Sequence, residues 1–308
     1  MRQLTLPCFA KVNWILKILG RRKDGFHQLR TLYQTVDLRD EISLTATRDA
    51  TITLEVQGYP IPADPSNLVC RAAELLREAT GRSQKGVRFL LRKRIPVGAG
   101  LGGGSSNAAV SLLGLNQLWN CGLSNRELSA LAEKLGSDVP FFLVGGMALG
   151  EGRGEIVSPL PDPIGREDLI LLFPRRSIST RDAYQFKDWG RWTGQEALTK
   201  DPVETTIQRF CALGTGRIWG FLENDFETAL FERYSFLRET AEALRVVGCE
   251  RVMLCGSGST LMGVGKPPGW SESSKDSLEK WGEVFPCETI SRRRYRAILH
   301  KAGLRSAA

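Results

Sequence analysis

The chain lacks most of the features that mark secreted, membrane-spanning or zinc-binding proteins. Its 308 residues include two histidines and seven cysteines, and no two cysteines have Cys-x-x-Cys spacing. An odd number of cysteines without such spacing indicates neither a disulfide framework nor a structural zinc site. No apolar run approaches the roughly eighteen residues of a membrane span, and no signal-peptide core follows Met1. We therefore expect a cytoplasmic protein with reduced thiols and no membrane contact.

Two common phosphate-binding patterns are also missing. In a P-loop a lysine directly follows the second glycine, whereas here Gly98 and Gly103 have the required separation and Gly104 stands in the lysine position. The tripeptides His-Arg-Asp and Asp-Phe-Gly of protein kinases do not occur. The sequence therefore excludes both arrangements.

A glycine-rich loop is the most informative feature that is present. Residues 95–109 contain five glycines and two serines, and an apolar helical pattern follows over residues 108–118. Glycine lets the backbone adopt positive φ angles and approach a ligand, and the first N–H groups of a helix have no internal partners. The helix dipole adds to their attraction for anions. The loop therefore predicts a phosphate-binding site.

The same loop matches the dinucleotide-binding pattern Gly-x-Gly-x-x-Gly at Gly98, Gly100 and Gly103. That pattern normally follows the first strand of a βαβ unit directly, whereas residues 93–96 intervene here. The acidic residue expected about twenty positions later would be Glu127, which also fits a helix-capping box. A dinucleotide-binding oxidoreductase thus stays as an alternative hypothesis.

The net charge of +8 favours anionic partners. Basic residues gather at residues 21–23, 92–94 and 292–296, and the last cluster is typical of a solvated face and a charged C-terminal tail. ATP and a nucleotide-diphosphate substrate would both be attracted. Nucleic acid is the rival partner, but the clusters are short and no nucleic-acid-binding motif occurs. We therefore expect no nucleic-acid partner, and leave the oligomeric state open.

The apolar patterns predict an α+β protein, and its length exceeds one comfortable core. Strand-like runs occupy residues 12–19, 29–36, 41–45, 51–56, 87–91, 169–173 and 251–255. Helical patterns occupy residues 68–80, 108–118, 124–136, 225–232 and 236–247. A proline-rich, charged stretch at residues 155–168 separates the two parts. We therefore expect an N-terminal domain at residues 1–160 and a C-terminal domain at residues 161–308.

Four segments resemble the GHMP kinases, the superfamily of galactose, homoserine, mevalonate and phosphomevalonate kinases. They are residues 10–13 with 24–27, residues 96–109, residues 136–142 and residues 256–260. The form of the loop, with Pro96 before Gly-Leu-Gly and Ser-Ser before Ala-Ala, is similar to that of one branch, the 4-diphosphocytidyl-2-C-methyl-D-erythritol kinase family. The resemblance spans nearly the whole chain, from Lys11 to Thr260.

This resemblance implies a two-domain GHMP kinase fold, with a first domain like ribosomal protein S5 domain 2 and a ferredoxin-like second domain. It implies an ATP-dependent kinase that uses Mg²⁺ and acts on a small-molecule substrate, a cytidine diphosphate derivative. The reaction would be phosphorylation of the 2-hydroxyl of 4-diphosphocytidyl-2-C-methyl-D-erythritol in non-mevalonate isoprenoid synthesis. Another GHMP kinase, of the mevalonate or homoserine type, is the alternative.

The resemblance implies that Asp138 receives or orients the proton of the substrate hydroxyl. Asp138 follows a predicted helix that ends at Gly136, and residues 139–143 are apolar. Partial burial of a carboxylate favours proton uptake and suits a general base, unless a nearby cation keeps it ionised. Without the resemblance, a helix-capping role for Asp138 is equally consistent with the sequence.

Lys11 is the expected partner of Asp138. Residues 10–19 alternate so that Val12, Trp14, Leu16 and Ile18 lie on one face and Lys11, Asn13, Ile15 and Lys17 on the other. A lysine beside Asp138 would keep the carboxylate charged and help neutralise the transferring phosphoryl group. Alone, such a lysine is typical of a solvated edge strand.

The candidate substrate-binding residues are Asn13, Phe26, His27, Tyr184 and Asp138. An Asp-Gly pair at residues 24–25 predicts a tight turn, and an aromatic ring beside a histidine at its exit can bind a flat heterocycle. The resemblance implies that this segment holds the cytosine, with Phe26 stacked on it and Tyr184 as a second aromatic. Ordinary packing is the alternative for both rings.

The candidate ATP-binding residues are those of the loop and two outside it. They are Pro96, Val97, Gly98, Ala99, Gly100, Leu101, Gly102, Gly103, Gly104, Ser105, Ser106, Asn67 and Lys93. Asn67 also fits a helix cap, and the resemblance places a similar asparagine near the adenine. Ser105 and Ser106 offer hydroxyls to phosphate or Mg²⁺, but the sequence does not identify the metal ligands. Residues 256–260 are expected to support the site, and nothing is predicted for residues 189–219.

Overall fold

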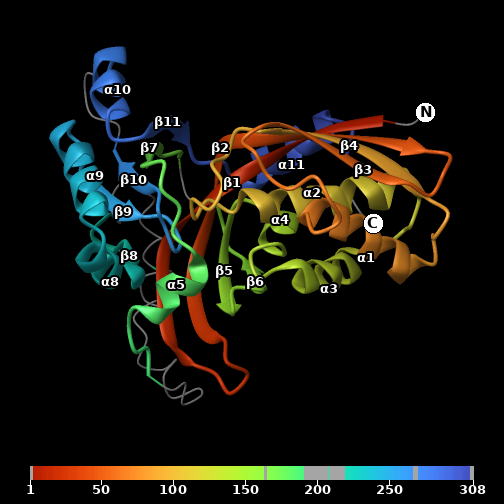
Figure 1. The fold of residues 1–308 in the computed structure, drawn as a ribbon, viewed down its shortest axis with the longest axis horizontal. Coiled ribbons are helices and arrows are strands. Elements are labelled where there is room, and N and C mark those ends of the chain that lie inside the picture. Colours follow the sequence, from red (N-terminus) through yellow and green to blue (C-terminus); the bar gives the residue numbers. More distant parts are fainter. Residues whose placement is uncertain (1–2, 163–164, 191–207, 209–218, 266–269, 306–308) are drawn as a thin grey trace.

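The computed structural model describes residues 3–162, 165–190, 208, 219–265 and 270–305. Two sheets organise this part of the chain (Figure 1). The strands of the first sheet are β1 (Gln3–Arg21), β2 (His27–Thr47), β3 (Ile52–Gly58), β4 (Gly86–Lys93), β5 (Met147–Gly152), β6 (Ile156–Pro159) and β8 (Glu223–Asn224). The strands of the second are β7 (Asp168–Phe173), β9 (Arg251–Leu254), β10 (Leu261–Val264) and β11 (Glu283–Glu288). Mixed strands and helices confirm the predicted α+β class.

A long antiparallel hairpin of β1 and β2 runs through both parts of the molecule (Figure 1). Its tight turn lies where Asp-Gly predicted it, and the Asp24 side chain accepts a hydrogen bond from the Phe26 N–H. The prediction of separate strands at residues 29–36 and 41–45 was wrong, because β2 continues through the intervening residues. The pairing of β2 with β1 shifts register there, because Phe9 pairs with Arg39 and Ala10 pairs with Val36.

A second register shift, between Asn13 and Ile15, changes the predicted alternation of β1. Ile15 was predicted on the face of Lys11, but it packs in the same buried cluster as Val12 and Trp14. Because the shift comes after Asn13, the Lys11 and Asn13 side chains keep their common face and bond to each other. The irregularity therefore leaves the candidate site residues of this strand together.

The helices of the first part cover one face of its sheet (Figure 1). They are α1 (Leu68–Thr80), α2 (Gly103–Leu118), α3 (Asn125–Leu135) and α4 (Phe141–Val144). Helix α2 is buried along most of its length and packs against β1, β2, α1 and α3. Helix α3 begins with the predicted capping box, in which the Ser124 and Glu127 side chains bond to each other's backbone N–H groups. Asp138 follows in the short connection to α4.

The second sheet has the order β11-β7-β10-β9, with every neighbouring pair antiparallel. Helices α8 (Phe226–Arg233) and α9 (Ser235–Val246) lie between β7 and β9 in sequence, and α10 (Glu272–Glu279) lies between β10 and β11. This βαββαβ succession confirms the expected ferredoxin-like second part. Two short elements, α5 (Thr180–Gln185) and the 3₁₀ helix η2 (Trp219–Phe221), belong to the connection after β7.

The last helix of the chain packs against the first part of the molecule. Helix α11 (Arg292–Lys301) buries Tyr295 and Leu299 in the same core as α1 and α2, whereas Arg293, Arg294 and Arg296 are exposed. The predicted solvated face is therefore confirmed, and the predicted tail was wrong, because the segment is a packed amphipathic helix. The predicted 161–308 domain therefore includes a helix that packs with residues 1–160. Strand β6 lies inside the stretch that was predicted to separate the domains, and it pairs with β5.

The described residues contain no helix that is long and apolar enough to cross a membrane. Six cysteines fall within the described ranges, and all six are free thiols. Residues 191–207 and 209–218, which make up most of the tryptophan-containing segment for which the sequence predicts nothing, lie outside these ranges.

Candidate active site

The glycine-rich loop joins β4 to α2 along a path that glycine adopts readily. Gly98, Gly100 and Gly102 have φ angles of 63°, 78° and 70°, which lie in the left-handed region. Gly102 is the N-cap residue of α2 and has no side chain with which to cap the helix. The N–H groups at this end of α2 are therefore available to an anionic ligand.

The loop is held by both parts of the molecule. From β1, the Lys11 N–H donates a hydrogen bond of 3.0 Å to the Leu101 carbonyl oxygen. From the turn between β9 and β10, the Thr260 N–H donates one of 3.3 Å to the Ala99 carbonyl oxygen. The glycine-rich residues 256–260 thus lie against the loop, as expected.

Gly100 is the position where a side chain would disturb this arrangement most. An added Cβ would lie 2.0 Å from the carbonyl oxygen of Cys255, and that oxygen belongs to the backbone. We expect Gly100→Ala to displace the loop and lower kcat/KM for ATP by about 100-fold, the loss that a misplacement of about 1 Å can cause. Steady-state kinetics with varied ATP measures this effect.

Gly122 offers the matched control for that substitution. Its φ of 73° is similar, but nothing lies within 4 Å of an added Cβ. Gly122→Ala should therefore leave kcat/KM for ATP unchanged. Wild-type kinetics in the Gly100→Ala enzyme would contradict the close contact between the loop and the second sheet.

Lys11 and Asp138 lie together beside this loop. The Lys11 Nζ atom is 3.4 Å from Asp138 Oδ2 and donates a hydrogen bond of 2.9 Å to Asn13 Oδ1. Asn13 Nδ2 in turn donates to Thr31 Oγ1 at 2.6 Å. The Lys11 side chain is 5% exposed and that of Asp138 is 31% exposed. The lysine is thus fixed in place, and the carboxylate remains accessible.

Tyr33 is a further neighbour of Asp138 that the sequence did not indicate. Its hydroxyl donates a hydrogen bond of 2.8 Å to Asp138 Oδ1, and its side chain is buried. Burial, and next the charge of Asp138, raise the pKa of the Tyr33 phenol well above its ordinary value. The phenol therefore stays protonated and remains a donor at neutral pH.

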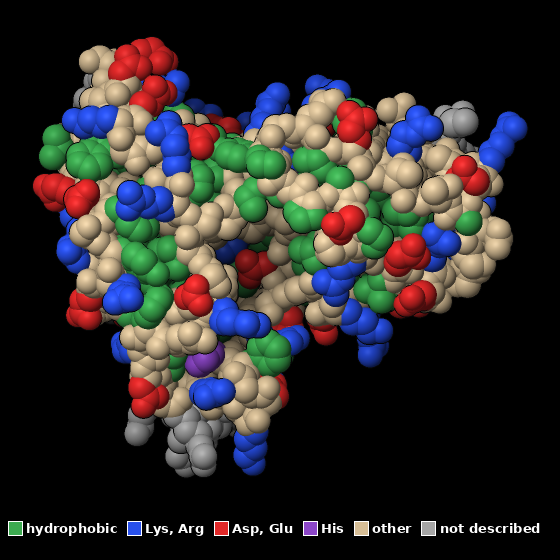
Figure 2. Space-filling model, in the orientation of Figure 1, with side chains coloured by type: hydrophobic (Ala, Val, Ile, Leu, Met, Phe, Trp, Pro, Cys, Tyr) green, Lys and Arg blue, Asp and Glu red, His purple; other side chains and the backbone are tan. Residues whose placement is uncertain are grey.

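A cavity of about 1030 Å³ lies between the two parts of the molecule, beside the half of the β1–β2 hairpin that contains its turn. Figure 2 shows the face of the molecule hollowed between these parts. The lining includes Lys11, Asn13, Phe26, His27, Ser105, Asp138, Tyr184 and Ser257. All five candidate substrate-binding residues are therefore in one cavity with Lys11.

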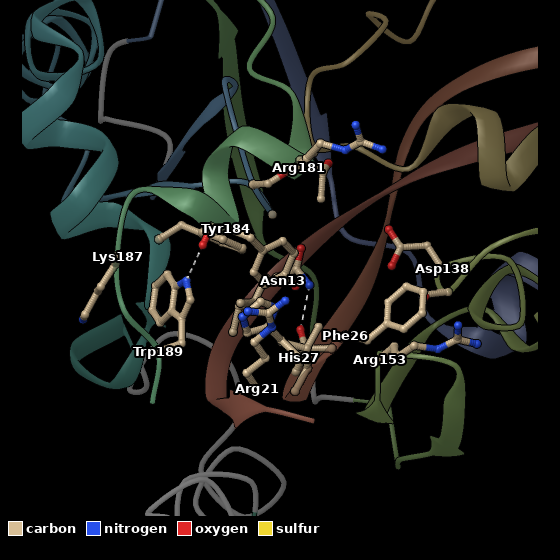
Figure 3. Close-up of a pocket in the computed structure, with 18 of the residues that line it drawn as sticks. Asn13, Arg21, Phe26, His27, Asp138, Arg153, Arg181, Tyr184, Lys187 and Trp189 are labelled. Carbon is tan, nitrogen blue, oxygen red and sulfur yellow. Dashed lines mark hydrogen bonds between the residues drawn. The ribbon is translucent and has the colours of Figure 1, made fainter. Parts of the chain in front are cut away.

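The lining of this cavity carries more positive than negative charge. Its basic residues are Lys11, Arg21, Arg153, Arg181 and Lys187, and its acidic residues are Asp138 and Asp188. Figure 3 shows Asp138 and Arg153 on one side, Tyr184, Lys187 and Trp189 on the other, and Arg21 and His27 between them. Such a lining suits an anionic ligand.

Near the turn of the hairpin, the rings of His27 and Tyr184 contact each other, whereas the Phe26 ring contacts Arg153. The His27 and Tyr184 rings are stacked, with centroids 4.4 Å apart and planes 9° from parallel. Phe26 is 52% exposed, and the Arg153 guanidinium lies 4.7 Å from its ring centroid. Burial, and then the charge of Arg21, lower the pKa of His27, which favours a neutral imidazole. Tyr184 therefore already has one face covered by His27.

A second cavity of about 350 Å³ is lined by the glycine-rich loop. Its lining includes Asn67, Lys93, Pro96, Val97, Gly98, Ala99, Leu101, Gly102, Gly103, Gly104 and Ser105. Ser105 lines both cavities. Ser106 lines neither of them, because its side chain is buried in the first turn of α2. The smaller cavity thus follows the loop, and Ser105 is the loop residue that it shares with the larger cavity.

The two candidate ATP-binding residues outside the loop have structural partners. Asn67 caps α1, since its Oδ1 accepts a hydrogen bond from the Val69 N–H. The Lys93 ammonium group is buried and paired with Asp40, which is also buried. Both residues line the smaller cavity, but their polar groups are already engaged. Their contribution to nucleotide binding would therefore be through the shape of the cavity.

Oxygen atoms suitable for Mg²⁺ line the larger cavity. Magnesium takes oxygen ligands, retains several waters and usually binds through one or two carboxylates and substrate phosphates. Asp138 and the Ser105 hydroxyl line the same cavity. Among the described residues, no three His, Cys, Asp or Glu side chains are grouped to hold a metal by themselves. The donor set therefore fits an ion that arrives with a nucleotide.

The sequence also missed Arg153, Arg181 and Asp40. The first two line the larger cavity from the turn after β5 and from α5. Asp40 lies behind the loop, paired with Lys93. A charged residue carries no local signal of which cavity or partner it faces, so only the tertiary arrangement identifies these three.

Comparisons with known proteins agree with this geometry. Residues 67–146 match the family model "GHMP kinases N terminal domain". A 4-diphosphocytidyl-2-C-methyl-D-erythritol kinase from Moorella thermoacetica is 38% identical, over 94% of this chain and 98% of that protein. One from Solibacter usitatus is 39% identical, over 98% of this chain and 93% of that protein.

A solved structure gives the same result. The crystal structure of a 4-(cytidine 5'-diphospho)-2C-methyl-D-erythritol kinase matches with a TM-score of 0.73 and 34% identity, and covers 93% of this chain and 99% of that one. Glu127, the acidic residue of the oxidoreductase hypothesis, serves instead in the capping box of α3. The chain therefore belongs to the 4-diphosphocytidyl-2-C-methyl-D-erythritol kinase family of the GHMP kinases, and is an ATP-dependent small-molecule kinase.

Proposed function

We propose that this kinase transfers the γ-phosphoryl group of ATP to the 2-hydroxyl of 4-diphosphocytidyl-2-C-methyl-D-erythritol. The observation that carries the proposal is that Ser105 lines both cavities, with the Lys11–Asp138 pair in the larger one. ATP would occupy the smaller cavity with its phosphates along the glycine-rich loop. The cytidine diphosphate derivative would occupy the larger one.

The residues of the site supply what phosphoryl transfer requires. The reaction needs the phosphates held, their charge neutralised and the attacking hydroxyl oriented. Free N–H groups at the start of α2 would hold the phosphates, and the buried Lys11 ammonium would stabilise negative charge on the transferring group. Asp138 would accept the proton of the 2-hydroxyl as the oxygen attacks phosphorus.

A magnesium ion bound with ATP would neutralise part of the phosphate charge, and the Ser105 hydroxyl is the group that would contact it. The cationic lining would bind the diphosphate of the acceptor substrate. The free thiols of the described cysteines support a reducing compartment, the cytoplasm.

The test is release of ADP by the purified protein with three acceptors. They are 4-diphosphocytidyl-2-C-methyl-D-erythritol (the cytidylyl substrate), mevalonate and homoserine. We expect turnover with the first alone. Turnover of mevalonate or homoserine without the first would contradict the proposal and retain the kinase fold. A thermal-shift comparison of an ATP analogue, NAD and single-stranded RNA tests the hypotheses of a dinucleotide-binding oxidoreductase and of a nucleic-acid partner. We expect stabilisation with the ATP analogue only.

Phe26 provides a prediction about the pyrimidine. The ring is half exposed beside the cavity, so its removal should not destabilise the fold. If it stacks on cytosine, Phe26→Ala should raise KM for the cytidylyl substrate by about 10- to 100-fold, because base stacking on an aromatic side chain contributes roughly 1–3 kcal/mol. The KM for ATP should not change.

Two further variants control for this experiment. Phe26→Tyr retains the ring and should retain the wild-type KM. Val246→Ala removes another exposed apolar side chain, on α9, and should have no effect. If Phe26→Ala binds the cytidylyl substrate as well as the wild type does, Phe26 is not its stacking partner.

A further inference from the structure

Tyr33 occupies a slot whose backbone is shaped around its ring. An added Cβ at Gly150 would lie 2.4 Å from the ring atom Cε2, and one at Gly154 would lie 2.5 Å from the hydroxyl oxygen. On another side the ring stacks on Phe141, with centroids 4.8 Å apart. Any side chain at either glycine would thus displace the phenol. The slot fixes the hydroxyl at a set distance from Asp138.

The hydroxyl has one good acceptor. Asp138 Oδ1 lies 2.8 Å away, whereas the other nearby acceptor, the Gly154 carbonyl oxygen, lies at 3.5 Å. At 3.5 Å a hydrogen bond is weak, so the phenol hydrogen points to the carboxylate. Tyr33 is 2% exposed, so little water reaches its side chain.

The two oxygens of Asp138 therefore have different partners. Tyr33 holds Oδ1 by a hydrogen bond, and the Lys11 ammonium group lies 3.4 Å from Oδ2. The same ammonium group lies 5.7 Å from the centroid of the Tyr33 ring. Two fixed partners, on β1 and β2, thus set the rotation of a carboxylate that is carried by a short loop.

We propose that Tyr33 is a positioning residue that holds Asp138 by Oδ1 and so directs Oδ2, beside Lys11, toward the alcohol of the acceptor substrate. This inference rests on the proposed function of Asp138 as the proton acceptor. The burial that raises the pKa of the phenol keeps it a permanent donor. Tyr33 itself takes no proton and contacts no reacting atom.

The first test is Tyr33→Phe, which removes the hydroxyl and retains the ring. A hydrogen bond to a charged group contributes roughly 1.5–3 kcal/mol. We therefore expect its loss to lower kcat by about 10- to 100-fold. Because Asp138 is not part of the ATP cavity, the KM for ATP should stay at the wild-type value. The double variant Tyr33→Phe/Asp138→Asn should be no slower than Asp138→Asn alone, since the hydroxyl acts only through the carboxylate.

Tyr295→Phe is the matched control. Tyr295 is also buried, and its hydroxyl donates to a backbone carbonyl oxygen, that of Phe142. The two variants lose one buried phenol hydrogen bond each, and so should lose similar thermal stability. Only Tyr33→Phe should lose kcat. An equal loss of kcat in both variants would show a structural role and overturn the inference.

Gly154→Ala tests the same bond without removing the Tyr33 hydroxyl, and it replaces the first test if Tyr33→Phe does not fold. Its Cβ would displace the Tyr33 hydroxyl, so kcat should fall while Tyr33 remains. Wild-type kcat in either folded variant would overturn the inference. ADP release by the wild-type enzyme with the cytidylyl substrate is measured first, because its absence would mean that the proposed function has failed and not the role of Tyr33.

Discussion

Asp138→Asn is expected to lower kcat by at least about 100-fold, with the KM for ATP within about twofold of the wild-type value. Asparagine has nearly the same shape but takes up no proton, and a positioned general base contributes about 10²- to 10⁴-fold to rate. Asp138 lines the larger cavity and not the smaller one. The effect should therefore fall on the chemical step and spare nucleotide binding.

The geometry explains why so large an effect is expected. Asp138 is the acidic residue that the Lys11 ammonium group contacts, and Lys11 is also tied to the glycine-rich loop through its backbone N–H. Proton acceptance, charge neutralisation and phosphate positioning are thus coupled within a few residues. Removing the carboxylate charge also leaves the buried Lys11 without an anionic partner.

Asp276→Asn is a suitable control, because Asp276 is exposed on α10, away from both cavities. It makes the same chemical change and should leave kcat unchanged. If Asp138→Asn retains more than about a tenth of the wild-type kcat, Asp138 is not the proton acceptor and another group takes the proton. Steady-state ADP release measures both variants.

Asp40→Ala is expected to destabilise the protein by about 3–5 kcal/mol, the cost of leaving a buried charge without its partner. The Asp40 side chain is 0% exposed and that of Lys93, its partner, is 3% exposed. Asp40 Oδ1 also accepts hydrogen bonds from the Arg94 and Ile95 N–H groups, at 2.7 and 2.9 Å. Asn107 Nδ2, on α2, donates to its Oδ2 at 2.9 Å.

This cluster fixes both ends of the glycine-rich loop. Arg94 and Ile95 lead into the loop, and Asn107 lies one turn into the helix that leaves it. We therefore expect Asp40→Ala to raise the KM for ATP as well as to lower the free energy of unfolding, measured by urea denaturation. Adding Lys93→Met should recover part of the lost stability, because the unpaired charge is then removed.

The neighbouring ion pair provides the control for stability. Glu41 and Arg92 also connect β2 to β4, but both side chains are close to half exposed. Exposed pairs of this kind contribute about 0–1 kcal/mol, so Glu41→Ala should have a small effect. A loss below about 1 kcal/mol in Asp40→Ala would mean that the buried pair stabilises the fold no more than an exposed one does.

Local patterns predicted much of the fold because their signals lie within one segment. The caps at Asn67 and Ser124 and the Asp-Gly turn each involve residues a few positions apart. By contrast, Tyr33 bonds to Asp138 across 105 positions and Lys93 bonds to Asp40 across 53. Lys93 looked available to phosphate because its partner could not be inferred from its neighbours in sequence.

Two errors had the same origin. The sequence predicts two strands, at residues 29–36 and 41–45, but β2 is continuous between them, and the Asp40 side chain bonds the backbone at the start of the loop. The basic residues of α11 suggested a tail, but Tyr295 and Leu299 face the first core. In both segments the stabilising contact comes from an element far away in sequence.

A structure of the enzyme with a non-hydrolysable ATP analogue and the cytidylyl substrate tests most directly whether the two cavities serve one reaction. We expect the terminal phosphate beside Ser105 and Lys11, and the 2-hydroxyl of the substrate in contact with Asp138. A nucleotide bound away from the glycine-rich loop, or a 2-hydroxyl on the far side of the cavity from Asp138, would contradict a shared site.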